Sequence, residues 1–268
     1  MTSTTRPLSD GATLSYREAG QGAPVVLIHG VGLQSAAWDP QIEALSMTHR
    51  VIALDMPGHG GSSPLAVDAT LPDFVAWLAR ALDALELEAV SLAGHSMGAL
   101  ITLGFAAAHP DRVTRAALLN PVYRRSPEAR AAVIARADEI RQGQIDLDTP
   151  LTRWFGDSSA DQAARADVAE WLGAVDLDGY ATAYSAFARG DTTYADRIGT
   201  IPCPLWAITG DGDPNSTPAM SWAIAAAAPR GRVLVIAGHR HMVNLTAPEA
   251  VNAALTDWLA SDTEGAKT

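Results

Sequence analysis

The stretch AVSLAGHSMGALITLGFAAAH, from Ala89 to His109, decides the fold class. A short apolar run leads into GHSMG and then directly into a helical pattern, which predicts a buried strand joined to a helix by a sharp turn. Such a turn leaves no room for side chains beside the serine, so Gly94 and Gly98 fit the two flanking positions of G-x-S-x-G. The turn would present the hydroxyl of Ser96 at a helix N-terminus. We therefore interpret Ser96 as a nucleophile rather than as a serine of a structural turn.

The remainder of the chain repeats this alternation of apolar runs and helical patterns. A helix is predicted from Leu71 to Glu86, after Thr70 as its cap, and an antiparallel edge strand is predicted in TLSYREAG near the start. Alternation of this kind is typical of an α/β fold with a doubly wound, mostly parallel sheet. The other predicted strands are PVVLIHG (24–30), VIALD (51–55), VTRAALLN (113–120), PLWAITGD (204–211) and RVLVIAG (232–238).

The alternation stops after residue 121, where Ala-rich helical patterns carry several large aromatic residues and no strand is predicted. We interpret residues 122–198 as a helical cap inserted into a core made of residues 1–121 and 199–268. Large aromatic residues at helical spacing are usually core, so we expect only a few to face a substrate, with Trp154 and Phe155 as the candidates. The other aromatic residues of the cap are Trp171, Tyr180, Tyr184 and Phe187.

Composition excludes several classes of partner. The chain has 268 residues, 48% of them hydrophobic, and a net charge of -11. Nucleic acid and anionic membranes reward clustered basic residues, so we expect neither and predict a small-molecule substrate instead. The single cysteine, Cys203, cannot form an intrachain disulfide, and no signal peptide or transmembrane run is indicated, so the cytoplasm is the expected location. No feature of the sequence determines the oligomeric state.

The segment HGVGL, from His29 to Leu33, follows the first parallel strand. In the geometry of such a turn, the amide of Val31 and the amide of Met97 would form an oxyanion hole for a tetrahedral intermediate. We expect Leu33 to line the substrate pocket, while Trp38 is as compatible with the core as with the pocket. His29 is interpreted as a structural residue of the loop.

Five motifs in order along the chain resemble those of the α/β-hydrolase superfamily: HGVG, DMPGHGGS, GHSMG, GDGDPNSTP and GHRHMVNLTAPE. The resemblance implies a catalytic acid in a G-x-x-D stretch after a late strand, which corresponds to Asp213, with Asp211 as the fallback. It also implies a sheet of eight strands, and a histidine seven residues before a Pro-Glu pair, which corresponds to His241. His239 lies two positions earlier, so this chain departs from the family pattern by a two-residue insertion or a register shift.

The His-x-His pair at His239 and His241 also admits a metal site, because alternate residues of an extended segment point the same way. No third histidine lies nearby and no metal-binding run of His and Asp follows, so we expect no metal. His59 and His95 are interpreted as residues that pack loops. Ser96, Asp213 and His241 would then act as nucleophile, acid and base, and this chemistry requires no cofactor.

The cap is similar to the caps of 3-oxoadipate enol-lactonases and related small-molecule esterases. We therefore predict hydrolysis of a carboxylic ester or a lactone through an acyl-enzyme. The alternatives are cleavage of a carbon–carbon bond or perhydrolysis by the same three residues, and a receptor that binds a ligand without turnover. Leu33 stands where many carbon–carbon hydrolases have proline, and an intact set of three residues disfavours the receptor.

Overall fold

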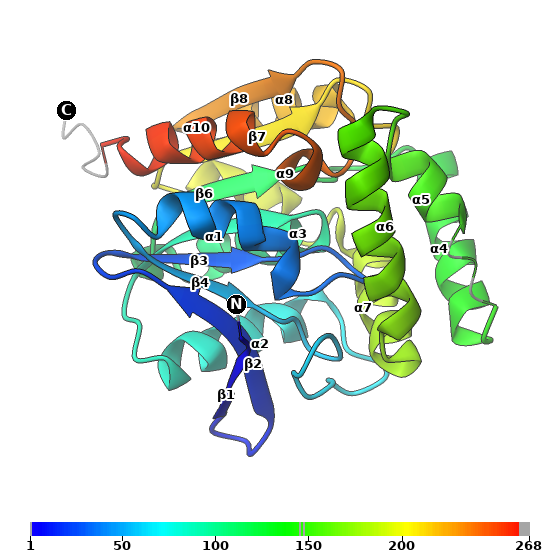
Figure 1. The fold of residues 1–268 in the computed structure, drawn as a ribbon, viewed down its shortest axis with the longest axis horizontal. Helices are drawn as coiled ribbons and strands as arrows, with labels where there is room; N and C mark the ends of the chain where they lie inside the picture. Colours follow the sequence, from blue (N-terminus) through cyan, green and yellow to red (C-terminus); the bar gives the residue numbers. More distant parts are fainter. Residues whose placement is uncertain (1, 145, 147, 263–268) are drawn as a thin grey trace.

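The computed structural model describes residues 2–144, 146 and 148–262 and contains one eight-stranded sheet (Figure 1). The strands lie in the order β1-β2-β4-β3-β5-β6-β7-β8, with β1, β2 and β4 paired antiparallel and all other neighbours parallel. This confirms the predicted α/β class. Strand β1 lies in a segment for which no strand was predicted. The strands are β1 (Thr4–Pro7), β2 (Thr13–Ala19), β3 (Pro24–Ile28), β4 (Arg50–Leu54), β5 (Val90–His95), β6 (Val113–Leu119), β7 (Leu205–Gly210) and β8 (Gly231–Ile236).

Alternate side chains of each parallel strand enter two separate hydrophobic cores, one on each face of the sheet. In β3, Val25 and Leu27 belong to the core beneath α1 and α10, whereas Val26 and Ile28 belong to the core beneath α2, α3 and α8. Helices α1 and α3 follow the neighbouring strands β3 and β5 but cover opposite faces. The carboxyl ends of these two strands therefore form the switch point at which open α/β sheets bind their ligands.

The helices around the sheet are short and begin or end at recognisable signals. Helix α2 starts after Thr70, whose N–H donates to Asp73 Oδ2 at 2.8 Å, and it ends before Glu86, which has a φ of +57°. A residue in this left-handed region cannot continue a helix, so α2 stops two residues before the predicted Glu86. The flanking helices are η1 (Ser35–Trp38), α1 (Asp39–Leu45), α2 (Leu71–Ala84), α3 (Met97–Ala108), η2 (Pro110–Arg112), η3 (Ala195–Thr200), α8 (Pro218–Ala227), α9 (Val243–Thr246) and α10 (Pro248–Leu259).

Four α-helices precede η3 in the described part of the chain between β6 and β7, and we call them the cap helices (green to yellow-green in Figure 1): α4 (Pro127–Arg141), α5 (Asp148–Trp154), α6 (Ser159–Ala174) and α7 (Leu177–Gly190). They stand at the carboxyl end of the parallel strands. The buried carboxylate of Asp191, directly after α7, joins the end of α7 to the start of α4. It accepts hydrogen bonds from the Arg125 N–H and from Arg130 Nη2, both at 2.7 Å. The division at residues 122 and 198 remains a prediction.

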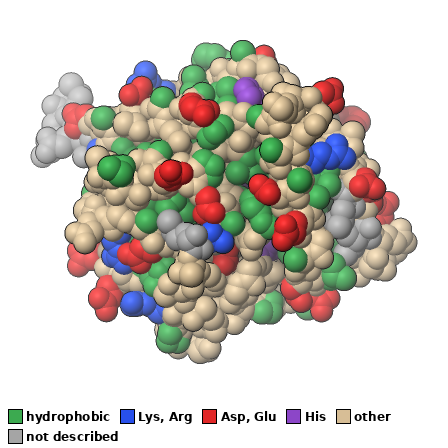
Figure 2. Space-filling model, in the orientation of Figure 1, with side chains coloured by type: hydrophobic (Ala, Val, Ile, Leu, Met, Phe, Trp, Pro, Cys, Tyr) green, Lys and Arg blue, Asp and Glu red, His purple; other side chains and the backbone are tan. Residues whose placement is uncertain are grey.

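The outer surface reflects the acidic composition. Figure 2 shows Asp and Glu side chains scattered across the face seen in Figure 1. Within the described residues, the helices are too short or too polar to cross a membrane.

Candidate active site

Ser96 occupies the turn between β5 and α3, as its sequence motif predicts. Its backbone is held at φ +54° and ψ -109°, a strained conformation for a residue with a side chain. Only glycine fits at the two flanking positions. A Cβ on Gly94 would lie 2.1 Å from the Gly98 oxygen, and a Cβ on Gly98 would lie 2.1 Å from the Ile28 oxygen. The turn therefore packs backbone against backbone, and the side chain of Ser96 is directed into the cavity described below.

Asp213 and His241 come together from loops 28 residues apart. His241 Nδ1 lies 2.7 Å from Asp213 Oδ2, and both side chains are almost fully buried. The same carboxylate accepts hydrogen bonds from Asn120 Nδ2 at 2.8 Å and from the N–H groups of Asn215 and Ser216 at 2.8 and 3.1 Å. The carboxylate can only accept, so Nδ1 of His241 carries a proton, and the tautomer with a free lone pair on Nε2 is the one that a neutral imidazole adopts here.

The electrostatics of Asp213 keep it charged. Burial by itself raises the pKa of this carboxyl, but the interaction with His241 and the two backbone N–H donors outweigh it. The pKa of Asp213 therefore lies below its ordinary value, and the group is a carboxylate near neutral pH.

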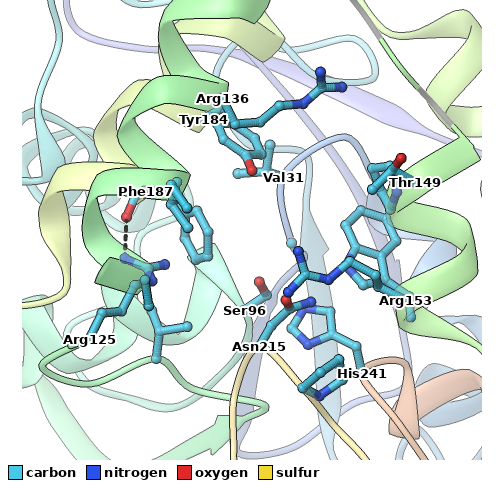
Figure 3. Close-up of a pocket in the computed structure, with 18 of the residues that line it drawn as sticks. Val31, Ser96, Arg125, Arg136, Thr149, Arg153, Tyr184, Phe187, Asn215 and His241 are labelled. Carbon is cyan, nitrogen blue, oxygen red and sulfur yellow. Dashed lines mark hydrogen bonds between the residues drawn. The ribbon is translucent and has the colours of Figure 1, made fainter. Parts of the chain in front are cut away.

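Ser96 and His241 line one cavity of about 580 Å³, which lies between the sheet and the cap helices (Figure 3). Among the described residues, no side chain or backbone group forms a hydrogen bond with the Ser96 hydroxyl. The structure thus places the three predicted residues in one site, with Asp213 behind His241 and Ser96 open to the cavity.

The two backbone amides predicted to form the oxyanion hole lie in the turns after β3 and β5. Val31 follows β3 and Met97 follows Ser96, and neither N–H donates a hydrogen bond to another described residue. Buried N–H groups without a protein partner are uncommon, and a developing oxyanion would satisfy both.

His29 and His59 hold the loop that carries the Val31 amide. His29 Nε2 accepts the N–H of Met56 at 2.9 Å, so its Nδ1–H donates to the Gly30 carbonyl at 2.7 Å. His59 Nε2 accepts the N–H of Gly32 at 3.0 Å. Burial lowers the pKa of His59 to about 3, so this ring is neutral. The two histidines therefore fix the peptide groups on either side of Val31, which is a more specific role than the predicted loop packing.

His95 also has a more specific role than loop packing. Its Nε2 donates to the His241 carbonyl at 2.8 Å, and the two ring centroids lie 5.0 Å apart. Burial, with a smaller effect of the neighbouring His241, lowers the pKa of His95 to about 3. Sequence reasoning missed this contact because 146 residues separate the two histidines.

His239 and Asp211, the alternatives to His241 and Asp213, lie away from this arrangement. His239 Nδ1 is 3.0 Å from Thr246 Oγ1, and Asp211 Oδ1 accepts the N–H of Gly238 at 2.8 Å on the surface. Across the described ranges, no three His, Cys, Asp or Glu side chains are grouped so as to hold a metal ion.

The predicted substrate contacts fall into two groups. Val31, Leu33 and Trp154 line the cavity. Phe155 does not, which corrects the prediction: it is 2% exposed, because it lies just past the end of α5 and its side chain packs in the core rather than in the cavity. Trp38 is likewise fully buried in the core. The ring of Trp154 stacks over His241, with centroids 5.7 Å apart and planes inclined by 28°.

Three arginines from the cap side line the cavity, and sequence reasoning missed all of them. Arg136 pairs with Glu139 at 3.3 Å, and Arg125 lies 3.4 Å from Asp191 and donates to the Phe187 carbonyl at 3.3 Å. Arg153 forms no hydrogen bond or ion pair with any described residue, and Figure 3 shows its guanidinium reaching into the space beside Ser96 and Asn215. The signal in the sequence was weak, because isolated arginines on helices are ordinarily solvated.

A family model described as the alpha/beta hydrolase fold matches residues 23–248 of the chain. The chain belongs to this family. Among curated relatives, the hydrolase is 52% identical over 259 residues to the (E)-2-((N-methylformamido)methylene)succinate hydrolase of Acinetobacter baylyi, covering 97% of this chain and 98% of that protein.

Solved structures agree with this assignment. A thermophilic esterase from Thermogutta terrifontis, in a malate-bound form, superposes with a TM-score of 0.87 and 26% identity, covering 97% of the hydrolase and 98% of the esterase. An enol-lactonase from Burkholderia xenovorans also superposes with a TM-score of 0.87, at 27% identity, covering 96% of the hydrolase and all of the lactonase chain. The predicted superfamily is therefore confirmed.

Proposed function

We propose that this hydrolase removes the acyl group of a small dicarboxylate of the (E)-2-((N-methylformamido)methylene)succinate type, with Ser96, His241 and Asp213 as nucleophile, base and acid. The observation that carries the proposal is the charge of the cavity. Three arginines and one glutamate line it, in a chain whose net charge is -11. A cationic cavity in an acidic protein favours an anionic ligand, and the substrate of the relative at 52% identity carries two carboxylates.

The arginines differ in their freedom to bind such a ligand. Arg136 and Arg125 already have acidic partners, whereas Arg153 has none among the described residues. A guanidinium binds a carboxylate through two parallel hydrogen bonds, so Arg153 is the arginine that gains most from a substrate carboxylate. We assign it the main contact with one carboxylate of the substrate.

We assign each step of acyl transfer to a group of the site. Ser96 Oγ attacks the formyl carbon as His241 Nε2 takes the hydroxyl proton, and the Val31 and Met97 amides bind the resulting oxyanion. The C–N bond then breaks, His241 returns the proton to the leaving nitrogen, and formyl-Ser96 remains. This nitrogen is bonded to one carbon of a C=C bond whose other carbon bears a carboxylate, and this conjugated system withdraws charge from the nitrogen. Water, activated by His241, releases formate and restores Ser96.

Hydrolysis of a carboxylic ester or lactone is the second candidate. The named esterase and enol-lactonase, at 26% and 27% identity, support it. Both reactions use the same acyl-enzyme, so the proposals differ in the acyl group and the leaving group rather than in the residues that act. The malate bound to the esterase agrees with a dicarboxylate in either case.

The test compares wild-type hydrolase with Ser96→Ala and Arg153→Gln on (E)-2-((N-methylformamido)methylene)succinate, with formate release as the measurement. Ser96→Ala should lower turnover by about three orders of magnitude or more, because the three residues act as a unit. Loss of one charge-assisted hydrogen bond costs about 1.5 to 3 kcal/mol, so Arg153→Gln should lower kcat/KM about tenfold to a hundredfold.

Two controls make the result specific. Arg153→Gln should leave hydrolysis of p-nitrophenyl acetate within about threefold of wild type, because this ester has no carboxylate. Arg165→Gln places the same substitution on the cap helix α6, outside the cavity lining, and should behave as wild type on both substrates. No formate from the dicarboxylate, together with hydrolysis of esters or lactones by Ser96, would favour the second candidate.

A further inference from the structure

Arg240 lies between His239 and His241 and links the loop after β8 to the cap helices. Its Nη1 donates to the Phe155 carbonyl at 2.7 Å and to the Thr152 carbonyl at 3.1 Å. Both carbonyls lie at the C-terminal end of α5, where helix carbonyls lack partners within the helix and carry partial negative charge. A guanidinium placed there satisfies two acceptors at once.

The same end of α5 contacts the proposed base directly. The N–H of His241 donates to the Trp154 carbonyl at 3.2 Å, and the Trp154 ring stacks over the imidazole. The His241 carbonyl accepts from His95, and the ring is held by Asp213. His241 is therefore fixed by the core through its carbonyl and ring, and by the cap through its N–H and one face of the ring.

Helix α5 also forms part of the cavity wall through Thr149, Pro150, Arg153 and Trp154. Arg153, the proposed ligand of the substrate carboxylate, lies in the chain between Thr152, whose carbonyl binds Arg240, and Trp154, whose carbonyl binds His241. One short helix thus contacts both the substrate space and the backbone of the base.

We propose that Arg240 is a positioning residue that seats α5 against His241, so that the base is aligned with Ser96 only while the cap is docked. This inference rests on the proposed roles of Ser96 and His241. It also explains the His-Arg-His sequence, in which the two-residue departure from the family pattern places an arginine beside the base. Arg240 itself does not line the cavity and touches no reacting atom.

The test measures the rate at which diethyl p-nitrophenyl phosphate labels Ser96 in wild type, Arg240→Met, Arg240→Gln and Arg240→Lys. This reagent has no carboxylate and requires only the nucleophile, the base and the oxyanion hole. Arg240→Met and Arg240→Gln should slow labelling about tenfold or more, and Arg240→Lys, which retains a cation on a long side chain, should recover most of the rate. The matched control, Arg232→Met on β8, removes an arginine that lies over Trp206 and should label as wild type.

The outcomes are separable. Equal labelling rates in all Arg240 variants, with only KM for the dicarboxylate raised, would show that Arg240 holds the cap without affecting the base, and would overturn the inference. Absence of labelling at Ser96 in wild type would instead contradict the proposed function. If Arg240→Met does not fold, as judged by circular dichroism, the comparison of Arg240→Gln with Arg240→Lys decides. Equal rates of Ser96 labelling in these two variants would overturn the inference.

Discussion

His239 and His241 are two residues apart on the loop after β8, but their rings have different neighbours. His241 contacts Asp213, Trp154 and His95, whereas His239 contacts Thr246. Only a base that can reach the nucleophile is essential for acyl transfer.

His241→Ala should therefore abolish hydrolysis, while His239→Ala should change kcat/KM by less than about tenfold. The measurement is steady-state hydrolysis of p-nitrophenyl acetate by both variants, with circular dichroism to verify folding. The opposite ranking would transfer the role of base to His239. Loss of wild-type activity after treatment with a chelator would favour the metal alternative instead.

At the scale of the element, two neighbouring aromatic residues at the C-terminal end of α5, its last residue Trp154 and the following Phe155, have different surroundings. Trp154 lines the cavity and Phe155 is buried in the core. Phe155→Ala should lower the free energy of unfolding by about 3 to 5 kcal/mol, the usual cost of a large-to-small change at a buried phenylalanine, and affect all substrates alike. Trp154→Ala should instead change the kcat/KM ratio between small and bulky acyl groups by an amount worth about 1 to 3 kcal/mol.

Urea unfolding and kcat/KM across a series of p-nitrophenyl esters of increasing acyl length measure the two effects separately. A changed acyl preference in Phe155→Ala, or an unchanged preference in Trp154→Ala, would show that the two residues do not divide their roles in this way.

For the whole molecule, buried histidines determine how stability responds to acid. The pKa values of His59 and His95 are lowered by burial to about 3, from an ordinary value of 6.5. Between these two values the unfolded chain binds a proton that the folded protein excludes, so stability falls as the pH falls. Each histidine contributes a slope of about 1.4 kcal/mol per pH unit in this window.

Replacing one of these histidines should flatten the acid dependence. His59→Asn is expected to lower stability at pH 7, through lost hydrogen bonds, but to reduce the slope of unfolding free energy between pH 6 and pH 4 by about 1.4 kcal/mol per pH unit. Urea unfolding of wild type and His59→Asn at a series of pH values measures this slope. A slope equal to that of wild type would mean that His59 is not buried as a neutral ring.

Much of this fold could be predicted because its signals are local. The apolar runs of β3 to β8 and the GHSMG turn each lie within a few consecutive residues. The two glycines of the turn are required because the backbone packs closely there, as it does in every turn of this kind. Strand β1 could not be predicted, since Thr4–Pro7 is an exposed edge strand without apolar alternation. Phe155 was placed wrongly because two consecutive aromatic residues at a helix end look alike in sequence, and packing alone decides which of them faces the core.

The sequence by itself determined the α/β class and the positions of the parallel strands, and its resemblance to α/β hydrolases predicted a serine, an acid and a histidine as the site residues. Only the tertiary structure decided which groups surround them: His95 behind the His241 carbonyl, Arg153 in the cavity, and Arg240 on the end of α5. The physical reason is chain distance. Strand and turn propensities depend on neighbours in sequence, whereas these contacts join residues 85 to 146 positions apart or depend on the direction of one helix face, which folding alone determines.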